Sequence, residues 1–334
     1  MSWPEGMRAG LLDRRGLLAG AGAALLPRAV AAQAPGSPGW PDRTVRLAVA
    51  FAPAGPADLV ARIVGDRLSQ VWGQAAVIEN RAGAGGNIGA QLVARARPDG
   101  LTALVTTSAF AVNPSLSRNA GYRPEELVAA ALMASTPNLL AVRPDSPARD
   151  IAGLIEMARR QPLNFGTAGV GTTPHLSAER LFRLLAKVDA QHIPFTGAGP
   201  ALTAVLGGQL ELASVALPAA MEMVRGGGIR ALAVTGARRS AALPEVPTLE
   251  EQGFPGVDDV TWTAMFFPAA TPGAIVTKAN ADVELALADP ATRRRLEAVG
   301  FDAMGGSVDA AAAYVATETR RWGEVVRAVG ITLD

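Results

Sequence analysis

The two histidines of the chain, His175 and His192, are the side chains best suited to proton transfer or metal binding. His175 and Glu179 stand four residues apart, a spacing that places both on one face of a helix, where they could hold a metal ion. The sequence does not identify a third side chain that would complete a metal site with this pair, and the chain contains no cysteine. We interpret His175 as a helix-start residue with a structural hydrogen bond and His192 as a packed histidine. We expect no metal and no cofactor.

A glycine-rich loop at residues 83–89 is the next candidate, because such loops can bind phosphate. Its spacing is G-x-G-x-x-x-G, so Ile88 stands where the third glycine of a dinucleotide-binding loop belongs. The loop also follows the second expected strand and not the first, and no lysine follows it as in a P-loop. These departures exclude both nucleotide-binding motifs. The chain also lacks the G-x-S-x-G motif of many hydrolases, so we predict no catalytic residues.

Residues 49–62 are typical of a strand, a turn and a helix, and they offer a place for an anion. Such a turn lies at the carboxyl end of a parallel strand, where open α/β sheets bind ligands. The free amides of a helix start attract negative charge, although Asp58 is placed to cap them itself. A ligand site and a purely structural turn both fit this segment.

Residues 166–175 repeat this pattern in the second half of the chain. Gly169 and Gly171 leave room for a ligand, and Thr172 and Thr173 can donate hydroxyl and amide hydrogen bonds at a helix start. An ordinary helix cap would also explain the threonines. Two such turns facing each other, however, would form a clamp around a small molecule.

The elements that position these turns alternate between strand and helix. Strands are expected at residues 44–51, 75–78, 101–107, 164–167, 193–195, 210–215 and 229–235, and helices at 59–72, 151–160, 175–185 and 198–206. Thr248 and Glu251 have the spacing of a helix capping box, and Thr271 and Asp289 each precede a proline at an expected helix start. This alternation predicts parallel sheets covered by helices on both faces.

The first 34 residues resemble a secretory signal. Arg14 and Arg15 precede a short apolar run at residues 17–26, and small residues fit cleavage between Ala31 and Ala34. The paired arginines indicate a twin-arginine signal, although an ordinary export signal can also carry two arginines. No later segment is long and apolar enough to cross a membrane. We therefore predict a periplasmic location without direct membrane insertion.

Composition narrows the possible partners. The chain has 334 residues, of which 49% are hydrophobic and 18% charged, enough for two domains with large cores. Removal of the first 34 residues leaves 27 basic and 28 acidic residues. This balance gives no electrostatic reason to expect binding of nucleic acid.

Several motifs together resemble the solute-binding proteins of tripartite tricarboxylate transporters, also called Bug receptors. The matching segments follow in family order over about residues 43–330 and are FAPAGPAD at 51–58, ENRAGAGGNIG at 79–89, PDG at 98–100, NP at 113–114, GVGTTPH at 169–175, LGGQ at 206–209, RALAVT at 230–235 and LPEVPT at 243–248. Each motif is loose by itself, but the set is specific.

The resemblance implies a type II periplasmic-binding-protein fold, an α/β architecture in which two lobes joined by crossing hinge segments close on a ligand. It implies small carboxylates as ligands. We expect residues 43–138 and 263–334 to form one lobe and residues 139–262 the other. The predicted ligand-binding residues are those of the two turns and of two adjoining strand ends: Phe51, Ala54, Gly55, Asp58, Thr107, Ser108, Gly169, Gly171, Thr172, Thr173, Phe195 and Thr196.

The chain departs from the family pattern in the direction of apolar side chains. The first turn usually reads PPGGPTD, and here Ala52, Ala54 and Ala57 replace a proline, a glycine and a threonine. The usual PYKG segment is Pro194-Phe195-Thr196-Gly197, which loses a phenol and an ammonium group. These departures leave the fold unaffected and put the usual ligand in doubt.

The function that follows is capture of a small organic acid by a monomeric receptor that serves the membrane subunits of a transporter or a sensor. A periplasmic enzyme on the same two-lobe scaffold is the alternative, and a general base or a nucleophile–base pair would favour it. A third possibility is an interaction protein without a ligand, which a large exposed apolar patch without a cleft would favour.

Overall fold

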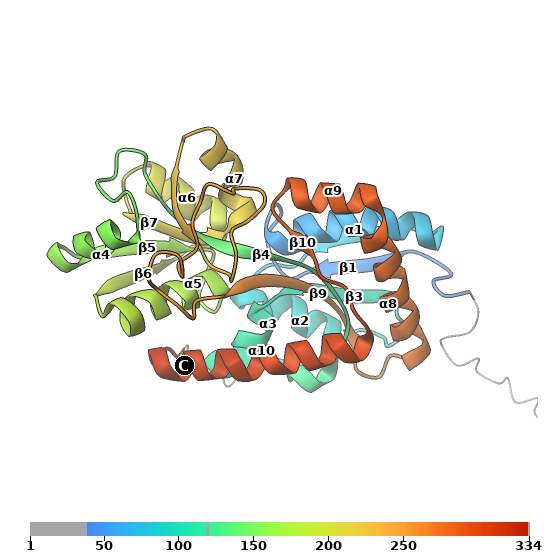
Figure 1. Ribbon diagram of the computed structural model, residues 1–334. Coiled ribbons are helices and arrows are strands. Elements are labelled where there is room, and N and C mark those ends of the chain that lie inside the picture. Colours follow the sequence, from blue (N-terminus) through green and yellow to red (C-terminus); the bar gives the residue numbers. More distant parts are fainter. Residues whose placement is uncertain (1–38, 118–119, 333–334) are drawn as a thin grey trace, which may run out of the picture. The chain divides into compact units, whose positions relative to one another are not determined.

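The computed structural model describes residues 39–117 and 120–332 of the chain. The signal segment predicted at residues 1–34 lies outside these ranges. Most of the strands lie along one hydrogen-bonded path, β8 (Arg230–Val234) and β10 (Asp302–Ala303) each pair with β4 (Leu127–Val142) beside it, and two α/β halves can be distinguished along the path (Figure 1).

The first half contains three parallel strands, in the order β2-β1-β3, with the antiparallel strand β9 beside β3. Helices α1, α8 and α9 cover one face through the core around Leu47, Val64 and Phe267, and α2, α3 and α10 cover the other around Leu104 and Trp262. Its elements are β1 (Val45–Val49), α1 (Pro56–Trp72), β2 (Ala76–Asn80), η1 (Ala84–Gly86), α2 (Asn87–Ala94), β3 (Thr102–Thr107), α3 (Ala109–Leu116), η2 (Pro124–Glu126), β9 (Val260–Pro268), α8 (Gly273–Ala288), α9 (Pro290–Ala298), β10 (Asp302–Ala303) and α10 (Val308–Val329).

The second half repeats this three-layer plan. Strands β6, β5 and β7 run parallel, with α4, α5 and η3 packed on the core around Phe165 and Phe182, and α6 and α7 packed on the core around Val205 and Met221. Its elements are α4 (Ile151–Arg160), β5 (Leu163–Thr167), α5 (Thr173–Glu179), the π-helical turn η3 (Arg180–Ala186), β6 (Ala190–Pro194), α6 (Ala198–Leu206), β7 (Leu212–Ala216), α7 (Leu217–Arg225) and β8 (Arg230–Val234).

Strand β4 (Leu127–Val142) joins the two halves because it belongs to both. Residues 127–137 pair antiparallel with β9, and residues 138–142 pair antiparallel with β7, which adjoins β5. The two halves are therefore the lobes of a type II periplasmic-binding-protein fold, as the resemblance implies. The prediction of purely parallel sheets is wrong in one respect. Strands β8, β9 and β10 each pair antiparallel with β4.

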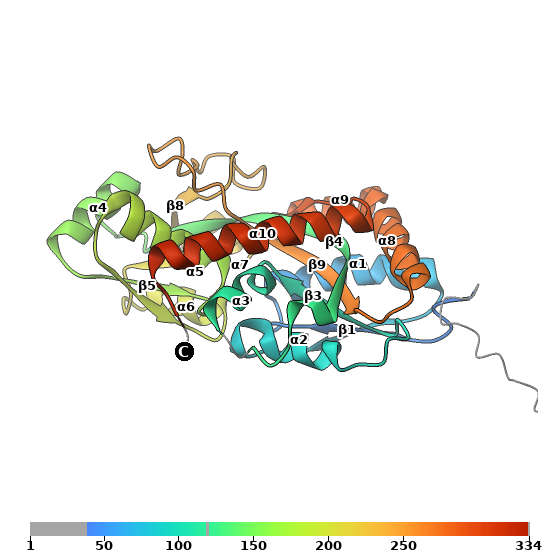
Figure 2. The same cartoon turned by 90° about the horizontal axis from the view of Figure 1, so that it is seen from below.

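Helix α10 is a second connection between the lobes. It lies along both of them in two perpendicular views (Figures 1 and 2) and contacts α3 in the first lobe and η3 in the second. Glu318 on this helix accepts hydrogen bonds from the indole nitrogens of Trp262 on β9, at 3.1 Å, and of Trp322, at 3.0 Å. The bond from Trp262 fixes α10 to β9 of the first lobe, and the contact with η3 continues the helix onto the second lobe.

Two predicted helix starts differ from the structure. Thr248 and Glu251 make both bonds of a capping box, at 2.7 and 3.1 Å, but they close a turn and not a helix. Gly253, at φ 88°, and Pro255 follow too soon for a helix to propagate. Helix α8 begins one residue later than predicted, with Pro272 and not Thr271 at its N-cap. Asp289 does cap α9, by accepting a hydrogen bond from the Thr292 amide at 2.9 Å.

Candidate ligand-binding site

The turn between β1 and α1 is organised around the Asp58 carboxylate, which is 2% exposed. It accepts hydrogen bonds of 2.9 Å from the Ala54 amide, from the Arg62 guanidinium and from the Asn80 side-chain amide. Burial alone would raise the pKa of Asp58, but these donors outweigh burial and hold the pKa below its ordinary value. Asp58 is therefore ionised and fully used in shaping the turn.

Ala54 is held in the left-handed region at φ 62°. This conformation costs an alanine about 1–2 kcal/mol, whereas glycine adopts it freely. The hydrogen bond from its amide to Asp58 offsets part of that cost. The turn therefore has at Ala54 a backbone conformation that favours glycine, together with the added methyl group of alanine.

A cleft of about 370 Å³ opens between this turn and the second lobe. One wall is the turn itself, and the other consists of the ends of β5 and β6 and the starts of α6 and α7. The lining residues are Phe51, Ala52, Pro53, Ala54, Gly55, Pro56, Ala168, Thr196, Gly197, Ala198, Gly199, Pro200 and Ala219. Among these residues, all in the described part of the chain, none has a charged side chain.

Three helices begin at the walls of this cleft. Helix α1 starts after Gly55, α6 after Gly197 and α7 after Ala216, and no side chain caps any of these starts. The first amides of a helix have no intrahelical partner, and the helix dipole adds a partial positive charge there. The cleft can therefore hold an anion without a cationic side chain.

The predicted site residues fall into three groups. Phe51, Ala54, Gly55 and Thr196 line the cleft. Asp58 lies behind the first turn, and Phe195 is half-buried beneath the second wall, with its amide donating to the Thr167 carbonyl at 3.1 Å. The structure does not bring the remaining predicted residues into the lining; these are Thr107, Ser108, Gly169, Gly171, Thr172 and Thr173.

The four residues of the third group that carry a hydroxyl group form hydrogen bonds within the protein. The Ser108 and Thr173 hydroxyl oxygens lie 3.2 Å apart, and Thr173 lies 2.6 Å from the Thr261 hydroxyl. Thr172 donates to the Gly169 carbonyl at 2.8 Å, and the Thr107 hydroxyl accepts from the Ala109 amide at 3.4 Å. Ser108 and Thr173 are 0% and 1% exposed, so this buried seam joins residues of the two lobes.

Sequence reasoning missed part of the second wall, namely Ala168, Gly197, Ala198, Gly199, Pro200 and Ala219. A signal was present, because β6–α6 and β7–α7 are two further strand–turn–helix units. Strand β5 is parallel to both β6 and β7, so their carboxyl ends meet at the same edge of the sheet.

The two histidines lie together on the far side of β5. Their rings stack with centroids 3.9 Å apart, and His192 Nε2 lies 2.7 Å from the Thr167 hydroxyl. Burial, and then repulsion from His175, lowers the pKa of His192 to about 3. The Gly171 amide donates to His175 Nδ1 at 3.4 Å, a structural contact of the kind predicted. Within the described ranges, no group of three or more His, Cys, Asp or Glu side chains is placed to hold a metal ion.

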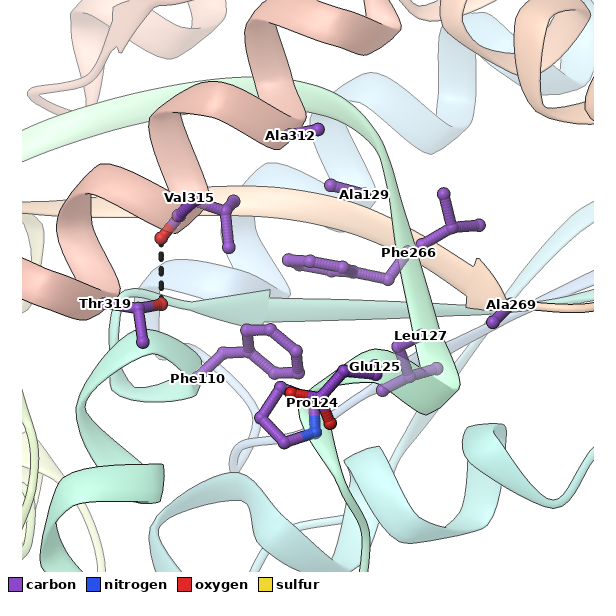
Figure 3. A pocket seen from close by; sticks show the side chains of 12 residues that line it. Phe110, Pro124, Glu125, Leu127, Ala129, Phe266, Ala269, Ala312, Val315 and Thr319 are labelled. Atoms are coloured by element: carbon purple, nitrogen blue, oxygen red, sulfur yellow. Dashed lines mark hydrogen bonds between the residues drawn. The ribbon is translucent and has the colours of Figure 1, made fainter.

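A larger apolar cavity of about 550 Å³ lies elsewhere, under α10 (Figure 3). Phe110 and Phe266 point toward its centre, and Val315 and Thr319 of α10 form one side. This cavity lies against the side of β4 and is not lined by the helix starts at the carboxyl ends of the strands. We assign the candidate site to the smaller cleft, where the donors converge.

Two lobes joined by a shared strand, with a cleft at the carboxyl ends of their strands, define a two-lobe solute-binding protein. Solved proteins of this class share the fold. The R. palustris protein Rpa4515, determined with adipate, is 36% identical and has a TM-score of 0.84, over 88% of this chain and 99% of that one. MatC from Rhodopseudomonas palustris, with bound malate, is 34% identical and has a TM-score of 0.79, over 86% of this chain and 100% of that one.

The particular family follows from the sequence comparison. Residues 60–331 match the tripartite tricarboxylate transporter family receptor. Protein BugT of Bordetella pertussis is 33% identical over 299 residues, which are 88% of this chain and 91% of BugT. The chain therefore belongs to the tripartite tricarboxylate transporter receptor family, and the resemblance seen in its motifs is confirmed. It is a solute-binding receptor and not an enzyme.

Proposed function

We propose that this receptor captures a small carboxylate in the cleft between the Phe51–Asp58 turn and the start of α6. The observation that carries the proposal is the convergence of the starts of α6 and α7, neither capped by a side chain, on one cleft at the strand ends, with the turn before α1 as the opposite wall. The adipate-bound and malate-bound relatives support a carboxylate as the ligand.

In this proposal Phe51, Ala54, Gly55 and Thr196 contact the ligand, and Asp58 and Phe195 position the two walls. Thr107, Ser108, Gly169, Gly171, Thr172 and Thr173 form the seam between the lobes and act on the ligand only through the geometry of the walls. The seam hydroxyls bond to one another or to the backbone, which supports this division.

The proposed lobes are residues 43–138 with 263–334, and residues 139–262. The change of partner along β4, from β9 up to residue 137 to β7 from residue 138, supports the first boundary. Closure would then occur by bending of β4 and β9 where they cross between the lobes.

We further propose that the receptor acts in the periplasm as a monomer, without a cofactor, after cleavage of its leader. It would deliver its ligand to the membrane subunits of a tripartite transporter or to a sensor. Within the described ranges, no helix has both the length and the hydropathy needed to cross a membrane.

A thermal-shift screen of the purified protein against carboxylic acids, including adipate and malate, tests the proposed function. A ligand that binds only the folded state raises the melting temperature with concentration, because binding adds to the free energy of unfolding. At least one acid should do so, and amines and neutral sugars should not. A flat response to all acids, with a shift by an uncharged compound, would contradict the proposal.

A further inference from the structure

Resting on the proposed function, we infer that the preferred ligand has a single carboxylate, held at the second-lobe wall, and an uncharged, largely apolar body against the first turn. A monocarboxylic acid should therefore bind better than the dicarboxylic acid with the same skeleton. The inference rests on the unequal chemistry of the two walls of the cleft.

The first-lobe wall has few hydrogen bonds to offer. Pro53 and Pro56 have no amide proton. The amide of Ala54 already donates to Asp58 at 2.9 Å, and that of Gly55 donates to the Ala52 carbonyl at 3.3 Å. The next two amides of the helix start belong to Ala57 and Asp58, which are 0% and 2% exposed and do not line the cleft. Only the strand-end amides of Phe51 and Ala52 remain on this wall.

The charge of the first-lobe wall is also used internally. Asp58 is ionised in the first turn of α1, where its negative charge opposes the positive end of the helix dipole. Arg62 neutralises Asp58 through two hydrogen bonds of 2.9 Å. The guanidinium group of Arg62 is therefore engaged by Asp58 and does not offer its charge to a ligand. What this wall presents to a ligand is the Phe51 ring and the apolar side chains of Ala54 and the prolines.

The second-lobe wall is different. Thr196 offers an exposed hydroxyl group, and Gly197, Ala198 and Gly199 bring backbone amides to the start of α6. The first turns of α6 and α7 contain no acidic residue, so their dipoles are not opposed locally. Pro200 and Pro218 have no amide proton, and Leu217, the first residue of α7, is 0% exposed. A carboxylate placed here therefore gains the Thr196 hydroxyl and the amides of Gly197, Ala198 and Gly199 as donors, supported by the dipoles of α6 and α7.

A second carboxylate would have to lie at the opposite, apolar wall. No cationic side chain lines the described cleft to receive it. Removing this second ionised group from water without a partner is unfavourable, and because the diacid has the same skeleton as the monoacid, no additional apolar contact offsets the cost. The unequal walls therefore select for one charge and against two.

Two matched pairs of acids test the inference by isothermal titration calorimetry on the intact protein. Hexanoate and adipate share a six-carbon chain, and benzoate and terephthalate share a ring, so each pair differs by one carboxylate. We expect the monoacid of at least one pair to bind, with a Kd at least about tenfold lower than that of its diacid. Equal affinities, or tighter binding of the diacids, would overturn the inference and leave the proposed function standing.

Pro53→Lys supplies the missing cation at the first-lobe wall, and Pro53→Gln is its uncharged control. The lysine variant should shift the adipate-to-hexanoate affinity ratio toward adipate by about tenfold or more, and the glutamine variant should not. No shift in the lysine variant would overturn the inference. If all four acids fail to bind while other carboxylates bind, the inference fails alone; if the whole carboxylate panel fails, the proposed function fails with it.

Discussion

The Asp58 carboxylate accepts a hydrogen bond of 2.9 Å from the amide of Ala54, the alanine that the first turn holds at φ 62°. One buried charge therefore holds a strained backbone in the shape that lines the cleft. The same carboxylate binds Arg62 and Asn80, so the shape of the turn, the electrostatics of α1 and the edge of β2 depend on one side chain.

Asp58→Asn should lower the free energy of unfolding by about 1–3 kcal/mol, because it weakens four hydrogen bonds to a buried carboxylate. The ion pair of Asp66 with Arg295 is exposed, and Asp66→Asn on the same helix should cost less than about 0.5 kcal/mol. Urea unfolding at neutral pH measures both. Because folding lowers the pKa of Asp58 from 3.8, the stabilisation is complete above that pH and is lost as the pH falls below it. Equal costs for the two variants would contradict this role.

The buried His192 should make the protein sensitive to mild acid. Folding lowers its pKa from 6.5 to about 3, so the unfolded chain binds a proton that the folded chain refuses between these values. Stability is therefore highest above pH 6.5 and falls as the pH decreases toward 3. Other ionisable side chains line the same cavity as His192, namely His175, Glu179, Arg183 and Asp189. They are present in both proteins of the comparison below, so the difference between the two proteins isolates His192.

The measurement compares unfolding of the wild type with that of His192→Gln, which does not titrate. Between about pH 7 and pH 5 the wild type should lose up to about 2 kcal/mol more than the variant. Parallel losses in the two proteins would show that His192 titrates normally.

The contact between the Ser108 and Thr173 hydroxyl groups should couple the two lobes energetically. Thr173→Val removes the partner of the buried Ser108 hydroxyl and should cost about 1–3 kcal/mol, whereas Ser108→Ala leaves Thr173 its contact with the Thr261 hydroxyl at 2.6 Å and should cost about 0.5–1.5 kcal/mol. The double variant should cost less than the sum, by about 0.5–1.5 kcal/mol, because the second change removes the unpaired partner. Thr203→Val lies at an exposed position of α6 and should add to Ser108→Ala without coupling. Full additivity in the first pair would mean that the seam contact contributes nothing.

The leader prediction can be tested on protein isolated from the native periplasm. Its intact mass should correspond to a chain that begins after cleavage between Ala31 and Ala34. Replacement of Arg14 and Arg15 by lysine should block export if the twin-arginine route is used. A mass that includes the first 30 residues would contradict the prediction of cleavage. Normal export of the lysine variant would indicate an ordinary export signal and not a twin-arginine signal.

Much of the fold could be read from the sequence because its signals are local. The helices predicted at residues 151–160 and 198–206 coincide with α4 and α6, and Gly73 ends α1 in the left-handed region at φ 63°. Apolar spacing, caps and glycines act within a few residues. The spacing of Thr248 and Glu251 predicts a helix start, but the pair closes a turn, because the same two side-chain hydrogen bonds can form in a turn and at a helix start.

The site was harder to predict because the direction of each turn depends on tertiary packing. Thr172 has the residue type of a ligand contact, yet its hydroxyl group turns back to Gly169, and Thr173 faces Ser108 across the seam. Gly199 and Ala219 carry no polar side chain, yet the helices that begin near them bring backbone donors to the cleft. Backbone amides leave no residue-type signature, so in the sequence only the strand–turn–helix pattern around them points to such donors.

Charge placed at Thr196 tests the central claim most directly. Thr196→Asp puts a carboxylate beside the proposed ligand carboxylate, and Thr196→Asn has nearly the same shape without the charge. For an acid that binds the wild type, isothermal titration calorimetry should show at least about a hundredfold weaker binding to the aspartate variant and less than about tenfold weaker binding to the asparagine variant. Circular dichroism should show both folded. Undiminished affinity in the Thr196→Asp protein would mean that the ligand binds elsewhere and would contradict the account.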